Sequence, residues 1–168
     1  VDENIGVATS SGAPSSCNLI AGIANAFFDS VPCLFLVGSV HSQAVRKSTA
    51  IRQNAFEELD MVSLVSGITK YAVKVDNPVD IRYCLEKAIF VAKGGRKGPV
   101  VIDIPYDVAR ADVNVDELRV FIPQQERQFD PIDVHGFIKI LKNSKRPLLL
   151  LGGGVRSTMS KRALCTDR

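Results

Sequence analysis

The stretch that decides the fold is CLFLVG, residues Cys33 to Gly38. A continuous apolar run of this length predicts a central parallel strand that is covered on both faces. Val100 to Ile104, closed by Pro105, predicts a second buried strand. Gly6 to Thr9 can form a short strand, and the alternating run Thr69 to Val75 predicts a strand nearer a sheet edge.

Helical patterns separate these strands. Asn18 to Asp29 predicts a helix whose apolar face is formed by Leu19, Ile23, Ala26 and Phe27. Asn77-Pro78 supplies an N-cap and a proline at the first helical position of a second helix, which Gly94-Gly95 ends. Ala55 to Val65 can form a short third helix. Strands that alternate with helices predict an α/β fold, a parallel sheet with helices on both faces.

The pattern divides the chain into three parts. Residues 1–113 carry the strands and helices above, residues 114–130 show little periodicity and predict a linker, and residues 131–168 begin a second α/β domain. Val1 to Asn4 resembles the approach to a strand, so we expect the first domain to be incomplete and to expose apolar surface. In the last part we expect a helix, a strand, a tight turn and a helix start at Ile132–Leu141, Pro147–Leu151, Gly152–Gly154 and Ser157–Arg168.

Composition excludes several classes of protein. The 168 residues are 46% hydrophobic and 23% charged with a net charge of +3, which is typical of a packed globule. The basic residues are scattered, which argues against a nucleic-acid partner, and no apolar run is long enough for a membrane span. The four cysteines have neither metal-ligand nor redox spacing, so we expect small buried side chains and a cytoplasmic location.

Short motifs taken singly do not identify an active site. The glycines at 152–154 lack the last glycine of a dinucleotide fingerprint, and Ser11 to Ser16 is more typical of a helix start than of an anion cradle. His41 and His135 have no obvious acid partner and are expected on the surface. The acidic cluster Glu57, Glu58 and Asp60 is typical of surface charge at a helix start.

Several short motifs occur in the same order as in one known family. They are Gly6-Val7, Ser11-Gly12-Ala13-Pro14, Asn18-Leu19, Gly22-Ile23-Ala24, Asp29-Ser30-Val31-Pro32, Phe56-Glu57-Glu58-Leu59-Asp60-Met61-Val62, Ile68-Thr69-Lys70-Tyr71-Ala72, Gly95-Arg96-Lys97-Gly98-Pro99, Val101-Ile102-Asp103-Ile104-Pro105 and Leu151-Gly152-Gly153-Gly154. Together they resemble the acetolactate synthase-like family of thiamine diphosphate-dependent enzymes over nearly the whole chain. Arg52 to Glu58 and Ile68 to Ala72 look most like the branch encoded with surface-polysaccharide genes.

The resemblance implies which domain of such an enzyme each part of the chain forms. Residues 1–113 would be the later part of the pyrimidine-binding domain, which holds the aminopyrimidine of thiamine diphosphate, and residues 131–168 would open the central domain. In such enzymes a neighbouring subunit holds the diphosphate through Mg²⁺, so a homodimer or homotetramer is expected. The family's activating glutamate would lie upstream of Val1 and its Gly-Asp-Gly metal motif downstream of Arg168. We therefore expect no catalytic residue and no metal ligand in this chain.

The resemblance also assigns site positions. The cofactor-binding ones are Gly12, Ala13, Pro14 and Asn18; Phe56 and Glu57 match positions facing the 2-oxo acid substrate, and Arg96 matches a flavin contact in members that bind FAD. Two departures stand out. Ser11 to Ser15 replaces the usual Thr-Ser-Gly-Pro-Gly, and Glu57 replaces a Gln. A charged group that only accepts hydrogen bonds disfavours a substrate carboxylate, which argues against acetolactate formation specifically.

Three hypotheses remain open at this point. The first is a fragment of a thiamine diphosphate-dependent 2-oxo acid decarboxylase or carboligase, which contributes the aminopyrimidine side of the cofactor site. The second is a non-catalytic truncated remnant. The third is a free-standing nucleotide-binding α/β module that uses Gly152 to Gly154.

Overall fold

The structure, a computed structural model, describes residues 4–45, 48, 50–123, 134–148, 150, 152 and 154. The chain divides into two compact units. Residues 2–123 form the first, which we call the sheet unit, and residues 124–168 together with residue 1 form the second. Each unit is described by itself.

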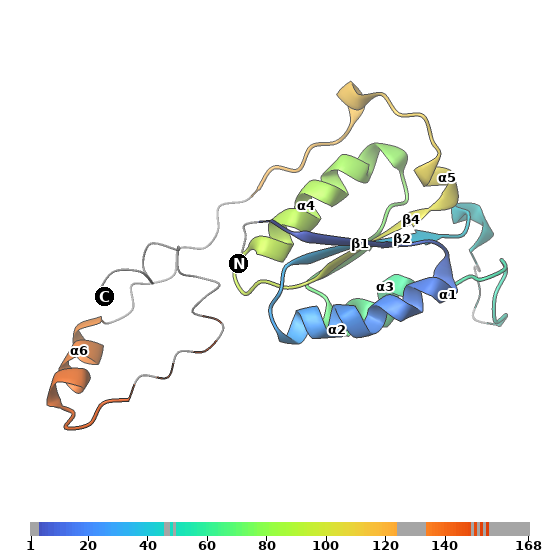
Figure 1. Cartoon of the computed structure of the whole chain (residues 1–168). Coiled ribbons are helices and arrows are strands. Elements are labelled where there is room, and N and C mark those ends of the chain that lie inside the picture. Colours follow the sequence, from blue (N-terminus) through green and yellow to red (C-terminus); the bar gives the residue numbers. More distant parts are fainter. Residues whose placement is uncertain are drawn as a thin grey trace. The chain divides into compact units, whose positions relative to one another are not determined.

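The described part of the sheet unit contains a four-stranded parallel sheet in the order β1-β2-β4-β3 (Figure 1). The strands are β1 (Gly6–Ser10), β2 (Cys33–Ser39), β3 (Tyr71–Lys74) and β4 (Val100–Pro105). The two continuous apolar runs of the sequence are the inner strands β2 and β4, and the alternating run is the edge strand β3. All three predictions are confirmed, because only a strand covered on both faces needs an unbroken apolar run.

Helices cover both faces of this sheet (Figure 1). On one face lies α4 (Ile81–Lys93), which packs its buried Cys84, Ala88 and Ala92 against Val100 and Ile102. On the other face α2 (Ile20–Phe28) and α3 (Met61–Val65) bury residues against Val37 and Val101. The predicted fold class is therefore confirmed.

The first helical segment begins earlier than its apolar pattern predicts. The chain is already helical in α1 (Ala13–Ser16), continues through a 3₁₀ turn at Cys17–Leu19 and then enters α2. A helix does start within Ser11 to Ser16, as predicted; Gly12 is its N-cap, and no side chain caps it. A proline at the first helical turn, Pro14, favours this early start because its fixed φ suits a helix.

The predicted helix Ala55 to Val65 is half correct. Only α3, from Met61 to Val65, is helical, and Asp60 caps it by accepting from the Ser63 N–H at 3.0 Å. Residues 54–58 form a turn instead, in which Glu57 has a left-handed φ of 60°, and residues 59–60 are not helical. A helix cannot pass through a residue with this backbone geometry, since right-handed helices need negative φ.

Residues 114–123 pack back onto α4. They follow α5 (Tyr106–Ala109) and contain a 3₁₀ turn at Val115–Glu117. The Phe121 ring lies 5.7 Å from the Tyr83 ring and 5.5 Å from the Phe90 ring, measured between centroids. The first ten residues of the predicted linker are thus part of the compact sheet unit, while the boundaries of the three parts as such stay a prediction.

The second unit is described only in part. Its helix α6 (Val134–Asn143) contains residues 134–141 of the expected helix and ends two residues later, while Ile132 and Asp133 lie outside the described residues. Pro147, Leu148 and Leu150 are not in a strand, contrary to prediction, because a strand needs a hydrogen-bonded neighbour and the described residues of this unit offer none. Leu149, Leu151, Gly153 and the expected helix start at Ser157–Arg168 lie outside the described residues.

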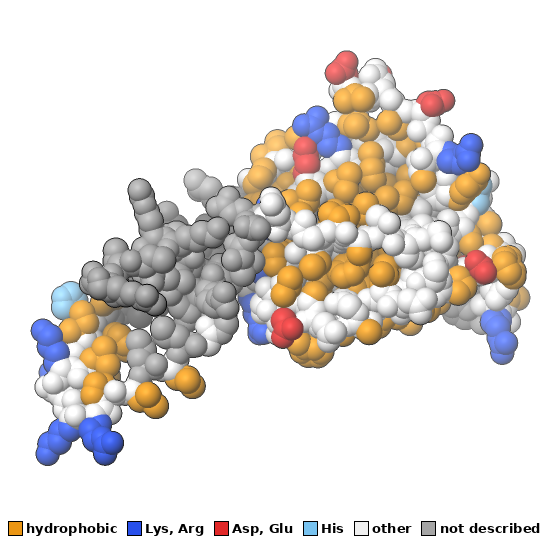
Figure 2. Space-filling model, in the orientation of Figure 1, with side chains coloured by type: hydrophobic (Ala, Val, Ile, Leu, Met, Phe, Trp, Pro, Cys, Tyr) orange, Lys and Arg blue, Asp and Glu red, His pale blue; other side chains and the backbone are white. Residues whose placement is uncertain are grey.

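Apolar side chains are visible on the outside of the sheet unit. They gather on the face where β1 lies in front, and Val7 of this edge strand is 57% exposed (Figure 2). Of the described cysteines, Cys84 is buried as expected and Cys33 is half-buried, whereas Cys17 is exposed. None of the described helices has the length and apolarity to cross a membrane.

Candidate functional site

The carboxyl ends of β1, β2 and β4 meet at one edge of the sheet, where ligand crevices of open α/β sheets lie. The segments that follow these strands, together with residues 55–57, surround an open hollow of about 570 Å³. We call it the Gly12 hollow. Its lining residues are Ser11, Gly12, Gly38, Ser39, Val40, His41, Ala44, Ala55, Phe56, Glu57, Ile104, Tyr106 and Ala109.

The loop after β1 is held by serine hydroxyls. The carbonyl oxygen of Gly12 accepts from the Ser15 hydroxyl at 2.8 Å and from the Ser16 hydroxyl at 3.2 Å. Ser16 is fully buried, and its Oγ also lies 2.8 Å from the Oγ of Ser10. The sequence SGAPSS therefore closes on itself through hydroxyl groups, which fixes Gly12 at the rim of the hollow.

The turn at residues 54–58 brings Phe56 and Glu57 to the same hollow. One carboxylate oxygen of Glu58 accepts from the backbone N–H of Asn54 at 2.7 Å and of Ala55 at 3.3 Å. The Phe56 side chain is left 83% exposed. A Cβ placed on Gly12 would lie 3.4 Å from Oε2 of Glu57, so the Glu57 carboxylate is directly in front of Gly12.

His41 is a lining residue that sequence reasoning missed. Its Nδ1 accepts from the Gln43 N–H at 3.3 Å and lies 3.6 Å from Oδ2 of Asp107, so the expectation that His41 lacks an acid partner is wrong. Asp107 in turn accepts from the Ser42 hydroxyl at 2.6 Å and from the Ser42 N–H at 2.8 Å. These two bonds hold the pKa of Asp107 down at about 2.

Position along the strands could have revealed this pair. His41 follows β2 and Asp107 follows β4, and both strands end at the same sheet edge. Predicting the His41–Asp107 pair from the sequence requires knowing that β2 and β4 are neighbours, because residues 66 positions apart show no spacing pattern.

The predicted site residues are only partly brought together. Gly12, Phe56 and Glu57 line the hollow, whereas Pro14 and Asn18 are exposed residues outside its lining, and the side chain of Ala13 is not described. Arg96 lies in the loop that leads into β4, at the amino ends of the strands. There its Nε donates to Oγ of Ser30 at 2.8 Å.

The chemistry of the described lining residues suits the aminopyrimidine end of thiamine diphosphate better than its diphosphate end. Apolar side chains such as Phe56, Ile104 and Tyr106 offer contact for an aromatic ring, and the Glu57 carboxylate can accept from a ring amino group. Among the described residues, the lining carries no Lys or Arg for a diphosphate. Within the described part of the chain, no group of acidic, His or Cys side chains could hold a metal ion.

The fold and the hollow define a class: a parallel α/β sheet with a small-molecule crevice at the carboxyl ends of its strands. Comparison with known proteins narrows this class. The chain is 33% identical to a probable acetolactate synthase large subunit of Methanocaldococcus jannaschii over 156 residues, 89% of this chain and 25% of that protein. It is 32% identical to the acetolactate synthase large subunit of Lactococcus lactis over 154 residues, 90% of this chain and 26% of that protein.

A third relative, the acetolactate synthase large subunit of Cyanidium caldarium, is 35% identical over 159 residues, 89% of this chain and 26% of that protein. The chain is thus homologous to part of acetolactate synthase large subunits and spans about a quarter of the length of these relatives. No family model matches the chain. The names of these relatives give no support to the surface-polysaccharide branch.

Proposed function

We propose that this chain supplies the aminopyrimidine side of the cofactor site in a thiamine diphosphate-dependent 2-oxo acid decarboxylase or carboligase. The observation that carries the proposal is the Gly12 hollow. Gly12, Phe56 and Glu57, three positions that the family resemblance assigns to cofactor and substrate, come from separate segments and line one crevice. Homology to part of acetolactate synthase large subunits supports the same assignment.

The residues of the hollow have distinct roles in this proposal. Ile104 and Tyr106 offer apolar contact for the aminopyrimidine ring, while Phe56 and Glu57 face the substrate. The serine hydroxyls of the loop fix the position of Gly12, and because glycine has no side chain, the ring can approach the backbone there. When bound, thiamine diphosphate supplies the carbon nucleophile that adds to a 2-oxo acid. The diphosphate and Mg²⁺ are held outside this hollow, because its described lining residues include no Lys or Arg.

The finer parts of the proposal concern the whole protein. In this proposal residues 1–168 supply neither the activating glutamate nor the metal motif, and a homodimer or homotetramer in the cytoplasm completes the site. Glu57 at the substrate side favours an acceptor other than a second 2-oxo acid, because its carboxylate repels a substrate carboxylate. An FAD contact at Arg96 would lie at the opposite edge of the sheet from the Gly12 hollow.

Binding of the ring alone tests the proposal. The probe is 4-amino-5-hydroxymethyl-2-methylpyrimidine, titrated into the ¹⁵N-labelled chain. We expect chemical-shift changes at the amides of Gly12, Gly38 and Phe56, none at Arg96, and no response of these amides to pyrophosphate with Mg²⁺. Shifts confined to residues outside the hollow, or a mononucleotide response near Gly152 instead, would contradict the assignment.

A pair of glycine variants sharpens this test. Gly12→Ala places a methyl group 3.4 Å from the Glu57 carboxylate, inside the hollow, and should weaken pyrimidine binding by about tenfold. Gly22→Ala is the matched control, because a Cβ at Gly22 meets nothing within 4 Å and lies on an exposed position of α2. It should leave the affinity unchanged; an equal loss in both variants would show that Gly12 acts through the fold only.

A further inference from the structure

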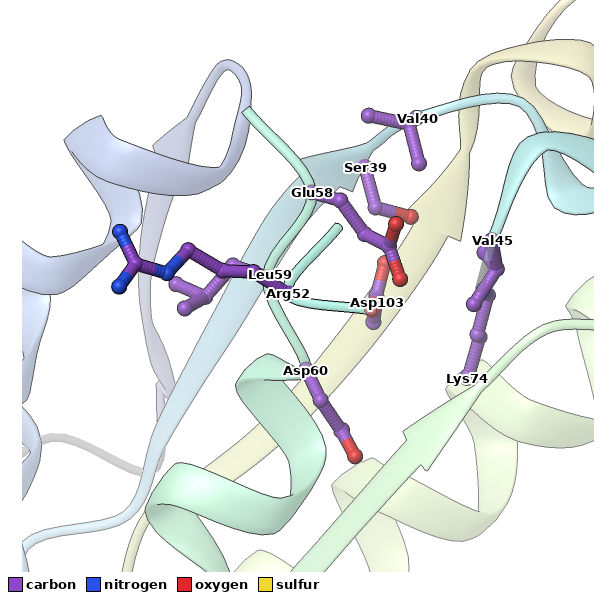
Figure 3. A pocket seen from close by; sticks show the side chains of 9 residues that line it. All are labelled: Ser39, Val40, Val45, Arg52, Glu58, Leu59, Asp60, Lys74 and Asp103. Atoms are coloured by element: carbon purple, nitrogen blue, oxygen red, sulfur yellow. The ribbon is translucent and has the colours of Figure 1, made fainter. Parts of the chain in front are cut away.

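A second hollow, of about 390 Å³, lies beside the first at the carboxyl ends of β2, β4 and β3 (Figure 3). Strand alternation explains which side chains enter it. Asp103 is in register with Lys74 of β3 and with Val37 of β2, so Lys74 and Asp103 point to the sheet face that α3 covers. Ser39, two residues after Val37, points to the same face. We call this space the Asp103 hollow.

Asp103 is the feature of this hollow that lacks an explanation in the fold. The residue is only 3% exposed. Within the part of the chain that the structure describes, its Oδ1 has no hydrogen-bond partner, and neither has Oγ of the adjacent Ser39. A buried polar atom without a partner costs about 1 to 3 kcal/mol, and more when it is charged. Such an atom facing an empty volume is a candidate contact for a ligand.

The other carboxylates of the hollow have local structural tasks. Glu58 accepts from the N–H groups of the turn at Asn54 and Ala55, and Asp60 caps α3. Figure 3 shows the side chains of Ser39, Glu58 and Asp103 converging on the hollow, whereas the Arg52 guanidinium extends away from them. Asp103 has no such task, and its carboxylate faces the interior.

We propose that the Asp103 hollow binds a small organic molecule that carries a primary ammonium group. The ammonium donates to Oδ1 of Asp103 and to Oγ of Ser39, and the aliphatic body of the ligand contacts Val40, Val45 and Leu59, which line the same space. A carboxylate only accepts hydrogen bonds, so its partner must be a donor, and a charged donor forms the stronger bond at a buried site.

Other ligand classes fit the hollow less well. Among the described residues, three carboxyl groups and two cationic side chains line the hollow, and these groups together repel an anionic ligand. A metal ion needs several convergent ligands, and no such group occurs among the described residues. A neutral donor would form a weaker hydrogen bond with the buried Asp103 carboxylate than a charged donor does.

Proton competition gives this site a characteristic pH dependence. Burial raises the pKa of Asp103, while the positive charge of Lys74 lowers it by a smaller amount. The charged groups around Asp103 are Lys74 and Asp76 at the end of β3, Asp60 at the start of α3, and Arg52 and Glu58 in the intervening turn. Because the ammonium binds the ionised carboxylate, affinity rises with pH as the Asp103 proton is lost.

The test compares three probes of similar shape on the ¹⁵N-labelled 168-residue chain: n-butylammonium, butyrate and n-butanol. We expect n-butylammonium alone to shift the amides of Val45, Lys74 and Asp103, which line this hollow and not the Gly12 hollow. Its affinity should increase between pH 5 and pH 8. Shifts at Gly12 and Phe56 instead would assign the probe to the other hollow and overturn the proposal.

Two variants complete the test. Asp103→Asn keeps the shape of the side chain and removes its charge, and should weaken n-butylammonium binding by about tenfold or more. Asp76→Asn, an exposed neighbour, is the matched control and should change the affinity less than twofold. Equal binding by Asp103→Asn, binding of butyrate to the same amides, or no response to n-butylammonium would each overturn the proposal. If Asp103→Asn fails to fold, the probe comparison in the unaltered chain decides.

Discussion

Asp107 shows at the residue scale how a local bond sets a pH dependence. Its pKa in the folded chain, about 2, is lowered by the Ser42 hydroxyl first and by the Ser42 N–H second. A carboxyl group whose pKa is lowered by folding stabilises the folded chain at pH values above its ordinary pKa, near 4. This contribution is lost as the pH falls through 2. Asp107→Asn should therefore reduce the free energy of unfolding at pH 7 by about 1 kcal/mol, a modest value because water screens this rim position.

Urea denaturation of both proteins between pH 7 and pH 2 measures this effect. The stability gap should narrow as the pH falls from 4 and be largely lost near pH 2, where about half of the Asp107 carboxyl groups are protonated. A gap that stays constant down to pH 2 would show that the carboxylate acts through shape and not through charge.

The pKa of Asp103 is shifted in the opposite direction to the pKa of Asp107. Burial raises its pKa, so the folded chain holds this proton more tightly than the unfolded chain does, and the associated stability is lost as the pH rises above the ordinary carboxyl range. Asp103→Asn removes the buried charge without changing the side-chain shape. At pH 8 we expect the free energy of unfolding of this variant to exceed that of the parent by about 1 kcal/mol. At pH 4 the difference between the two should be smaller. A lower melting temperature at pH 8 than the parent would contradict this.

The C-terminus of α2 requires a left-handed backbone conformation at Ser30. Ser30 has a left-handed φ of 57°, the Val31 N–H donates to the Ala26 carbonyl at 2.8 Å, and the Ser30 N–H donates to the Phe27 carbonyl at 3.3 Å. This is a Schellman motif, in which glycine is favoured. Ser30→Gly should be more stable than Ser30→Ala by about 1 kcal/mol, since both lose the hydroxyl but only alanine keeps the strained Cβ. Thermal denaturation of the two variants measures the difference; equal melting temperatures would rule out the strain.

Elements with strong periodicity were predictable from the sequence, and those set by single local bonds were not. The strand at Cys33–Ser39 follows from an unbroken apolar run, and the helix after Asn77-Pro78 follows from its cap. The turn at residues 54–58 does not, because the Glu58 carboxylate replaces helical hydrogen bonds with its own. The early helix start at Ala13 depends on a network of serine hydroxyls that composition alone describes only as loop.

The candidate site depends on the arrangement of the whole molecule. The strand order β1-β2-β4-β3 places residues after Ser10, Ser39 and Pro105 at one edge, and no sequence spacing encodes that order. The resemblance to a known family supplied Gly12, Phe56 and Glu57. The structure added His41 with Asp107, and the buried carboxyl of Asp103, whose position between β2 and β3 is a consequence of sheet order.

The extent of the sheet unit can be tested by truncation. Residues 114–123 return along α4, where the Arg119 N–H donates to the Val79 carbonyl at 3.0 Å and the Phe121 N–H donates to Glu86 at 2.8 Å. A chain that ends at Pro123 should unfold at the same temperature as the sheet unit of the full chain. A chain that ends at Val113 should lose about 2 kcal/mol, because the Phe121 ring and two backbone hydrogen bonds are removed.

Glu86 provides an independent readout of the same truncation. The Arg82 side chain lowers the pKa of Glu86 first and the Phe121 N–H second, so the pKa of Glu86 should rise in the chain that ends at Val113. Phe121→Ala in the full chain is the matched variant: it removes the ring contacts with Tyr83 and Phe90 but keeps the backbone bond. It should lose stability without moving the pKa of Glu86. Equal stability of the chains ending at Val113 and Pro123 would place the boundary of the folded unit at Val113, because residues 114–123 would then contribute no net stabilisation.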